Sequence, residues 1–399
     1  MNRYRNVITG AIFLVALVVL AIGQSMLEKK AAAQSKAPMV EVPRFEVDPL
    51  FPKPLPNKWY QGQTIGLGVD AQDHVWIVHR SDSPTANELA LDNKTGLCCA
   101  AAPPVLEFDQ QGNLLRHWGG SDGPGYQWPA SNHGITVDKK GNIWIGGNGN
   151  GNDGHVLKFT KDGKFLMQVG IKRQGLTSDS NSLERFHAVA KIFDDPKSNE
   201  LYIADGYGNR RVAVIDGDSG KILRFWGAYG NKPDDGALPA YNPDGPLSQQ
   251  FRGPVHCAVI SNDRIVYACD RRNNRVQSFT ADGKFIKEVQ VQPKTLGDGS
   301  TWDIAFSKDP QQKYIYLADG HNEKVWILDR ASLEVLTSFG SGGRQPGQFY
   351  AVHSIDTDSR GNIYTTETYD GRRLQRFLYK GMMKIEKGRD QGTPWPEAK

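Results

Sequence analysis

The chain has little of what marks a nucleic-acid-binding protein or a cysteine-ligated metal protein. Among its 399 residues the formal net charge is only +4, and the lysines and arginines are scattered rather than clustered. Proteins that bind the phosphate backbone of nucleic acids usually have a concentrated basic surface, so nucleic acid is excluded as a partner. Only four cysteines are present, and none has the CxxC spacing of a zinc or redox motif.

Long apolar runs are also absent, with one exception near the N-terminus. Arg3 and Arg5 precede an apolar stretch at residues 7–23, whose length is at the border of a membrane span. Positive charge before such a stretch is typical of a secretory signal, either cleaved or retained as an anchor. We therefore expect residues 1–34 to direct export, and the rest of the chain to be extracytoplasmic, secreted or tethered to the membrane.

The four cysteines fit an oxidising compartment without requiring one. Cys257 and Cys269 flank a turn near Asn262, so they face each other across one hairpin. A disulfide and a buried reduced pair are both compatible with that position. Cys98 and Cys99 are adjacent in a loop, and we expect neither a metal site nor a redox motif there.

Glycine, by contrast, is abundant, and many of the 43 glycines lie in turns of a repeated unit. Each unit consists of four short β-runs separated by Asp-Gly, Gly-Asn or Asn-Asn turns, which are typical of antiparallel hairpins. No run of helical period separates the units, which argues against a helical fold. The second run of each unit begins at His74, Gly141, Asn199, Arg264, Lys313 and Gly361.

Six four-stranded units predict an all-β fold, a single six-bladed β-propeller, in preference to a two-sheet sandwich or an open array. We expect the propeller at residues 60–385, after a Pro-rich extended lead-in at 35–59 and before a polar tail at 386–399. The turn pattern Asp-x-x-Gly-Asn-Ile-Tyr, followed by Asn-x-Arg-Val-Gln-x-Phe, resembles NHL repeats over residues 60–380.

Three histidines occupy the same place in three of these units. His133, His256 and His353 each open the first strand of the second, fourth and sixth unit. Alternate blades of a six-bladed ring lie about 120° apart, and first strands line the central channel. Three imidazoles converging at one level with an open fourth position suit catalytic zinc. The alternative is that each histidine is structural and bonds the next blade.

Other polar side chains fall on the same rim of the predicted ring. Tyr207 lies in the turn Asp-Gly-Tyr-Gly-Asn-Arg, Arg80 follows the second strand of the first unit, and Arg271 follows that of the fourth. A phenol held near cations can act as a base, and a guanidinium grips a carboxylate with two hydrogen bonds. Alternatively, Tyr207 is a turn residue that packs on the next blade. Arg211 and Arg275 begin outward strands, and we expect them to serve the fold.

The chain also resembles the peptidyl-α-hydroxyglycine α-amidating lyase family, which has a six-bladed NHL-type propeller. The resemblance spans the whole propeller. It implies cleavage of a C–N bond, giving a peptide amide and glyoxylate. It further implies a zinc ion on the three histidines, Tyr207 as the catalytic tyrosine, and Arg80 and Arg271 as active-site arginines. The implied substrate is a small or peptide-like molecule that carries a carboxylate.

Some residues depart from the family pattern. The family has an aspartate after the third zinc histidine, where it helps to hold a structural calcium ion, whereas this chain has Ser354. Carbonyl ligands of that calcium would fall near Leu67 and Ile135. Residues 81–104 and 228–250 are long insertions that can reshape the mouth of the channel, so a different substrate is compatible with the sequence.

Two other functions compete with the lyase hypothesis, because fold alone does not determine function. One is a non-catalytic NHL propeller that acts as an extracytoplasmic binding platform. The other is a gluconolactonase-like hydrolase, whose metal site uses carboxylate and amide oxygens. The three histidines argue against the hydrolase, because imidazole favours zinc and other transition metals over calcium.

Overall fold

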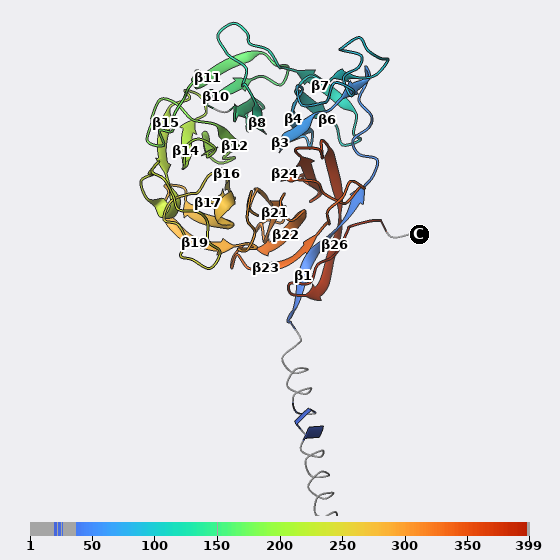
Figure 1. Cartoon of the computed structure of the whole chain (residues 1–399), viewed down its shortest axis with the longest axis vertical. Coiled ribbons are helices and arrows are strands. Elements are labelled where there is room, and N and C mark those ends of the chain that lie inside the picture. The colour runs from blue at the N-terminus through green and yellow to red at the C-terminus, as the bar shows by residue number, and fades with distance from the viewer. Residues whose placement is uncertain (1–19, 22, 25, 27–36, 150, 397–399) are drawn as a thin grey trace, which may run out of the picture.

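The computed structural model describes residues 20, 21, 23, 24, 26, 37–149 and 151–396, and within them it contains six four-stranded antiparallel sheets. The sheets are arranged as blades around one centre (Figure 1). The chain is thus an all-β, six-bladed propeller, as the repeats predict. The expected signal or anchor at residues 1–34 lies almost entirely outside the described residues. None of the helices in the described part of the chain is long and apolar enough to span a bilayer.

Each blade runs from an inner strand at the channel to an outer strand at the rim. The first three blades are β3 (Gln63–Val69), β4 (Val75–Arg80), β6 (Val105–Phe108) and β7 (Leu114–Trp118); β8 (Asn132–Val137), β9 (Ile143–Gly147), β10 (Asp153–Phe159) and β11 (Phe165–Lys172); β12 (Val189–Asp194), β13 (Glu200–Asp205), β14 (Arg211–Asp216) and β15 (Ile222–Trp226).

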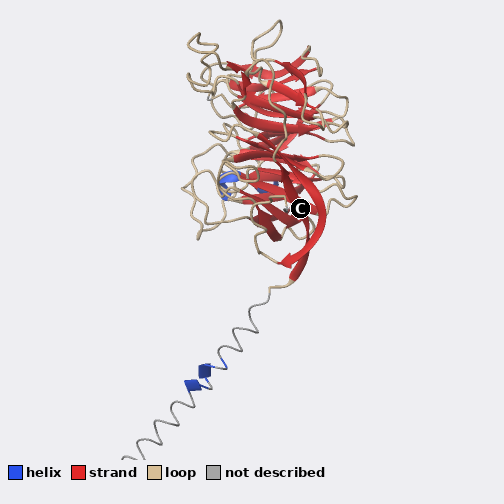
Figure 2. Ribbon diagram, turned by 90° about the vertical axis from the view of Figure 1, so that its right-hand side faces the viewer, coloured by secondary structure: helices blue, strands red, loops and turns tan. Residues whose placement is uncertain are grey.

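The last three blades are β16 (Val255–Ile260), β17 (Ile265–Asp270), β18 (Arg275–Thr280) and β19 (Phe285–Gln290); β20 (Asp303–Phe306), β21 (Tyr314–Asp319), β22 (Lys324–Asp329) and β23 (Val335–Phe339); β24 (Val352–Thr357), β25 (Ile363–Glu367), β26 (Leu374–Glu386) and β1 (Met39–Asp48). A parallel pair, β2 (Trp59–Tyr60) and β5 (Ala100–Ala101), and two 3₁₀ turns, η1 (Ala228–Gly230) and η2 (Arg271–Asn273), lie in the connections. Seen from the edge, loops extend from both faces (Figure 2).

The turn between the first two strands of a blade explains the repeated Asp-x-x-Gly-Asn signature. In the second blade, one oxygen of Asp138 accepts backbone N–H groups of Lys140 and Asn142, and the other accepts the indole N–H of Trp144. Gly141 has a φ of 80°, which glycine adopts without steric cost. The turn and the buried Trp144 therefore fix the hairpin register from local sequence.

The inner strands are buried on both faces because neighbouring blades pack against them. All six residues of β16 are buried, whereas the outer β7 alternates between exposed and half-buried residues. The Cys257–Cys269 pair forms a disulfide that joins β16 to β17 within this core. Cys98 and Cys99 are also joined as a disulfide, in the 81–104 insertion.

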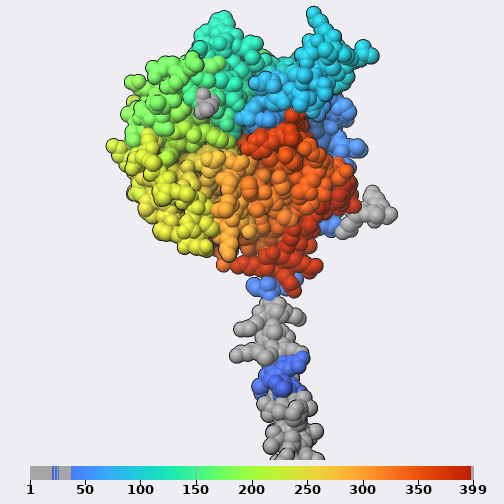
Figure 3. Space-filling view, viewed as in Figure 1, coloured from blue at the N-terminus to red at the C-terminus, as the bar shows by residue number. Residues whose placement is uncertain are grey.

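The ring is closed by pairing the two ends of the chain. β1, from the segment expected as a lead-in, forms the outer strand of the sixth blade against β26. β1 and β26 lie side by side in the ribbon view (Figure 1), and in the space-filling view blue atoms from the N-terminal part touch red atoms from the C-terminal part at the lower edge of the ring (Figure 3). Part of the expected tail also joins the ring, since Gln391 donates its backbone N–H to Ser338 O. The closing strand hides the β26 edge, which would otherwise be free to pair.

We predict that Phe45→Ala destabilises the closed ring by about 3–5 kcal/mol, because a large buried ring would be lost from β1. Phe45 is 3% exposed, and its ring centre lies 5.4 Å from that of Tyr316 and 5.5 Å from that of Phe339. Urea unfolding measures the change. Met39→Ala is the matched control on the same strand, since Met39 is 60% exposed. Equal stability of the two variants would show that β1 does not close the ring.

Candidate functional site

The three histidines predicted from the repeats meet at the centre of the ring. His133 comes from β8, His256 from β16 and His353 from β24. Their ring centres are 4.7–5.2 Å apart, and one nitrogen of each lies within 4.8 Å of the others. Three neutral imidazoles at this spacing can hold one transition-metal ion, such as zinc.

A β-bulge at the start of the inner strand turns each histidine toward the centre. The pairing register skips one residue at His256 in β16, at His353 in β24 and next to His133 in β8. The same irregularity occurs in β3 and β12. A bulge re-aims a side chain that regular pairing would direct elsewhere. The backbone of these strands therefore aims the imidazoles.

The blade that follows each histidine blade supplies the group that orients the imidazole. His133 Nδ1 lies 2.6 Å from Ala190 O in the third blade, and His256 Nδ1 lies 2.5 Å from Trp302 O next to the fifth. The third contact passes through a hydroxyl: His353 Nδ1 lies 3.2 Å from Ser354 Oγ, which donates to Ile65 O. Because carbonyls only accept, Nδ1 carries the proton and Nε2 is left as a lone-pair donor to a metal.

The imidazoles are held in the neutral form that metal ligation requires. Burial lowers the pKa of His133 to about 3, and the charge of Arg80 adds to that effect. Burial also lowers the pKa of His256 and His353 well below the usual value, and the nearby Arg271 adds to both shifts. No proton therefore needs to be displaced from these ligands near neutral pH.

Tyr207 is brought against the histidines by two close backbone approaches. Any side chain at Gly206 would collide with the Val255 backbone, and one at Gly208 would collide with the His187 ring. The phenolic oxygen lies 3.1 Å from His133 Nε2 and 3.0 Å from His256 Nε2. Both Nε2 atoms are hydrogen-bond acceptors, whereas the phenol has one proton and can donate to only one of them at a time. One Nε2 lone pair therefore lacks a donor, and a metal ion bound to the Nε2 atoms would satisfy it.

Arg80, at the end of β4, is a half-buried arginine without an acidic partner. It donates to Gln63 Oε1 and Asn148 Oδ1, both at 2.9 Å, and its Nε has no hydrogen-bond partner. In the described part of the chain it forms no ion pair with any carboxylate. Burial lowers its pKa, yet arginine stays charged at neutral pH. Arg80 is therefore suited to bind an anion that enters the site.

Arg271, in η2, completes the rim beside the phenol. It donates to Tyr207 OH at 3.3 Å and pairs with Asp298 at 3.1 Å, and its guanidinium carbon lies 4.4 Å from the Trp302 ring centre. Asp298 also accepts from the hydroxyl of Tyr369 at 3.3 Å. Stacking and pairing hold this guanidinium rigidly.

Asp298, Tyr369, Gln63 and Asn148 were not found from the sequence. Asn148 and Tyr369 follow the second strands of their blades, the same place that Arg80, Tyr207 and Arg271 occupy, so the repeat offered a signal for both. Gln63 opens β3 and Asp298 lies between β19 and β20, and their approach to Arg80 and Arg271 has no sequence signal. Trp302 did have a sequence signal, because it occupies the position in the fifth unit that corresponds to the histidines.

A buried ion pair lies beside the histidines. Lys191 Nζ is 2.6 and 2.7 Å from the two oxygens of Asp303, which also accept the backbone N–H groups of Ile304 and Ile355. Burial raises the pKa of Asp303, and Lys191 opposes that rise. Together with Ser354, this pair lines a cavity of about 10 Å³ that also borders the three histidines.

That cavity does not fit the calcium ion considered from the sequence. A calcium ion in a protein is usually coordinated by about six to eight oxygen atoms, several of them from carboxylates. Here Leu67 and Ile135 do border the cavity, but the only carboxylate in it is already neutralised by an ammonium group, and Ser354 supplies no second charge. A calcium ion would have to displace Lys191 from Asp303.

Comparison with known proteins gives the same resemblance as the repeats. NHL repeat-containing protein 3 of Mus musculus is 26% identical over 361 residues, 85% of each chain. Peptidyl-alpha-hydroxyglycine alpha-amidating lyase 1 of Drosophila melanogaster is 23% identical over 270 residues, 63% of this chain and 45% of that protein. The resemblance is therefore confirmed. The chain has NHL-repeat and amidating-lyase homologues.

The match to the larger amidating enzymes is partial. Peptidyl-glycine alpha-amidating monooxygenase of Mus musculus is 24% identical over 339 residues, which are 82% of this chain and 31% of that protein. The chain thus spans about a third of its length. No family model matches the chain. A solved virginiamycin B lyase from Staphylococcus aureus is 15% identical, with a TM-score of 0.47 over 88% of this chain and 89% of that chain.

We predict that Ser354→Ala weakens zinc binding by about tenfold or more, because His353 would lose the hydroxyl that orients it. Ser354→Thr keeps a hydroxyl and should bind zinc more tightly than the alanine variant. Isothermal titration with zinc measures both affinities. Ser359→Ala, in an exposed turn of the same blade, is the control. Unchanged affinity in Ser354→Ala would remove the positioning role.

We predict that Lys191→Met lowers the free energy of unfolding by about 3–5 kcal/mol, because Asp303 would be left as an unpaired buried charge. Adding Asp303→Asn should restore part of the lost stability by removing that charge. Urea unfolding measures both variants, and a Lys191→Met variant as stable as the wild type would contradict the prediction.

Calcium is tested separately. A rise in the wild-type unfolding midpoint on addition of calcium would contradict the conclusion that calcium does not fit this cavity.

Proposed function

We propose that the protein is a metal-dependent lyase that cleaves the C–N bond of an α-hydroxyglycine to give an amide and glyoxylate. The observation that carries this proposal is one cluster: three Nε2 atoms converge beside a phenol and an arginine, Arg80, that has no acidic partner. The cluster combines a metal site, a base and an anion site within one channel mouth.

The proposed metal is zinc, held by His133, His256 and His353. Bound zinc supplies a Lewis acid that lowers the pKa of a coordinated hydroxyl group. Three histidine ligands leave a fourth position for the substrate oxygen. Imidazole also suits copper, iron and nickel, so the identity of the metal rests on measurement.

Arg80 and Arg271 would bind the substrate carboxylate and stabilise the charge that develops during cleavage. Arg80 is free to do so, since its present partners are the neutral Gln63 and Asn148. Arg271 is held against Trp302 and next to the phenol, so it would face the reacting end of the substrate.

Tyr207 would serve as the base. As a phenolate beside the metal and the two arginines, it would accept the proton of the substrate hydroxyl as the C–O bond becomes a carbonyl and the C–N bond breaks. The electron pair of the broken bond goes to nitrogen, which receives a proton and leaves as the amide. The hydroxyl proton is thus transferred to nitrogen overall, and no oxidant or water is consumed.

Two further lines support the proposal. The name of the Drosophila melanogaster lyase includes the proposed substrate, a peptidyl-α-hydroxyglycine; that lyase is 23% identical to this chain, and the match covers 45% of it. Export to an oxidising compartment is part of the proposal, supported by the apolar N-terminal stretch and by the two disulfides.

A second candidate is a non-catalytic binding platform. It is favoured by the match to NHL repeat-containing protein 3, which extends over 85% of both chains. This function predicts that the folded protein neither requires a metal nor releases glyoxylate. The gluconolactonase-like alternative has less support, because the central ligands are imidazoles rather than carboxylates.

We predict that the zinc-loaded protein releases glyoxylate from an N-acyl-α-hydroxyglycine, and that Tyr207→Phe reduces kcat at least about a hundredfold. The phenylalanine keeps the ring but removes the proton acceptor, which is typically worth about 10²–10⁴ in rate. Glyoxylate is measured as its hydrazone, and zinc content by elemental analysis.

Arg360→Gln, in a turn on the opposite face, is the control that should retain wild-type turnover. If Tyr207→Phe retained activity, Tyr207 would not be the base, while the proposed reaction and metal site would be unaffected. A folded, zinc-supplemented wild type that binds no metal and releases no glyoxylate would favour the binding platform.

A further inference from the structure

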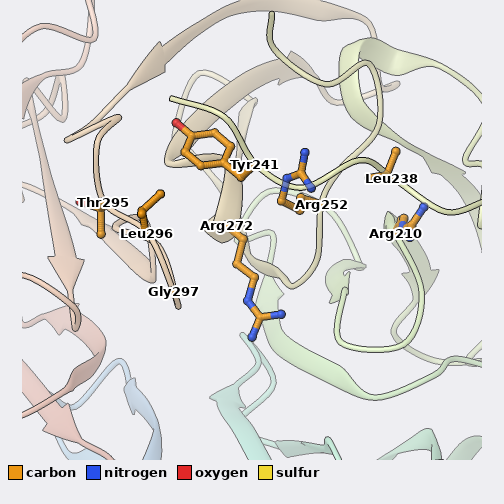
Figure 4. A pocket seen from close by; sticks show the side chains of 8 residues that line it. All are labelled: Arg210, Leu238, Tyr241, Arg252, Arg272, Thr295, Leu296 and Gly297. Carbon is orange, nitrogen blue, oxygen red and sulfur yellow. The ribbon is translucent and has the colours of Figure 1, made fainter. Parts of the chain in front are cut away.

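Three arginines line a second hollow (Figure 4), which lies next to Tyr207 of the proposed active site. It has a volume of about 430 Å³. Arg210 comes from the loop after β13, Arg252 precedes β16, and Arg272 belongs to η2. Leu238 and Tyr241 of the 228–250 insertion, and the segment 295–297 after β19, form the rest of the lining. We call this hollow the arginine pocket.

Two of these arginines have no acidic partner. Arg210 donates to the backbone carbonyls of Asp234 and Gly236, and Arg252 donates to Asn273 Oδ1 and Pro239 O. Within the described residues neither forms an ion pair. Hydrogen bonds to neutral acceptors hold the two guanidinium groups in place but leave their charge uncompensated.

Two of the carboxylates nearby are already paired with arginines. Asp298 is shared by Arg271 and Arg272, at 3.1 and 3.2 Å, and the buried Asp270 pairs with Arg275 at 2.8 Å. Asp234 and Asp235 form no ion pair within the described residues: Asp235 accepts from Ser180 with both oxygens, and Asp234 accepts from Gly236 N with one. Burial lowers the pKa of Arg252; the carboxylate of Asp270 opposes that shift, and neighbouring Arg210 and Arg275 add to it.

The arginine pocket adjoins the catalytic cluster at Tyr207. A smaller hollow of about 270 Å³ is lined by the same three arginines and by Tyr207. Tyr207 in turn contacts His133 and His256 through its hydroxyl. A substrate whose reacting end lies at the histidines can therefore extend past the phenol and reach the arginines with its other end.

We propose that the arginine pocket binds a carboxylate on the acyl part of the substrate, which makes acidic peptidyl-α-hydroxyglycines the preferred substrate class. The ligand is the acidic side chain of the residue that precedes the hydroxyglycine. This assignment rests on the proposed function for the position of the reacting end. Anion binding by the pocket is a property that can be measured without turnover.

The first test is therefore binding of two uncleavable, isosteric dipeptides to the full zinc-loaded protein. Acetyl-Glu-Gly should bind about tenfold more tightly than acetyl-Gln-Gly, the effect expected for one charge-assisted contact. Arg272 is exposed, and replacing it in Arg272→Gln should reduce that preference. The double variant Arg252→Gln, Arg272→Gln should abolish it. Arg360→Gln on the opposite face should keep it. Isothermal titration gives the affinities, and circular dichroism checks that each variant is folded.

The second test compares turnover of the two matching α-hydroxyglycine dipeptides. The glutamate compound should have the higher kcat/KM, mainly through KM, and Arg272→Gln should reduce that difference. If neither compound releases glyoxylate but the binding preference is present and needs the arginines, the lyase proposal fails and the anion pocket stands. Equal binding of the two peptides by the wild type, or no binding of either, overturns the pocket.

Discussion

The site depends on one hydrogen-bond pattern repeated around the ring. Each histidine is aimed inward by a bulged inner strand and is then held by an acceptor from the following blade. The carbonyls of Ala190 and Trp302 act directly, and that of Ile65 acts through Ser354. Because the acceptors come from neighbouring blades, the imidazoles are correctly placed only when the ring is closed. The pairing of β1 with β26 is thus part of the site, although it lies at the rim.

Charge is distributed unevenly around that centre. The histidines are neutral, while Arg80 lacks an acidic partner and Arg271 shares one with Arg272. In the buried interior, Lys191 is neutralised by Asp303. The uncompensated positive charge therefore lies at the mouth and in the arginine pocket. Anions would be drawn to that face, where low-dielectric walls strengthen the field.

Much of this arrangement was predictable from the sequence, because equivalent positions of a repeat occupy equivalent places in successive blades. Equal spacing within the units gives the six blades, and it brings His133, His256 and His353 to one level. Tyr207 could be placed on the rim because it occupies a repeated turn. What could not be predicted depends on contacts between loops of different blades, such as Asp298 with Arg271. The strand role of β1 was missed because its partner is more than 300 residues away.

The most direct test of the account is anomalous diffraction at the zinc edge from crystals of the full chain grown with zinc. The account predicts a single strong peak about 2.0–2.1 Å from the Nε2 atoms of all three histidines, with Tyr207 beside it. It also predicts no comparable peak between Lys191 and Asp303. A zinc peak elsewhere, or no peak at the three histidines in well-ordered crystals, would contradict the central claim that alternate blades assemble one metal centre.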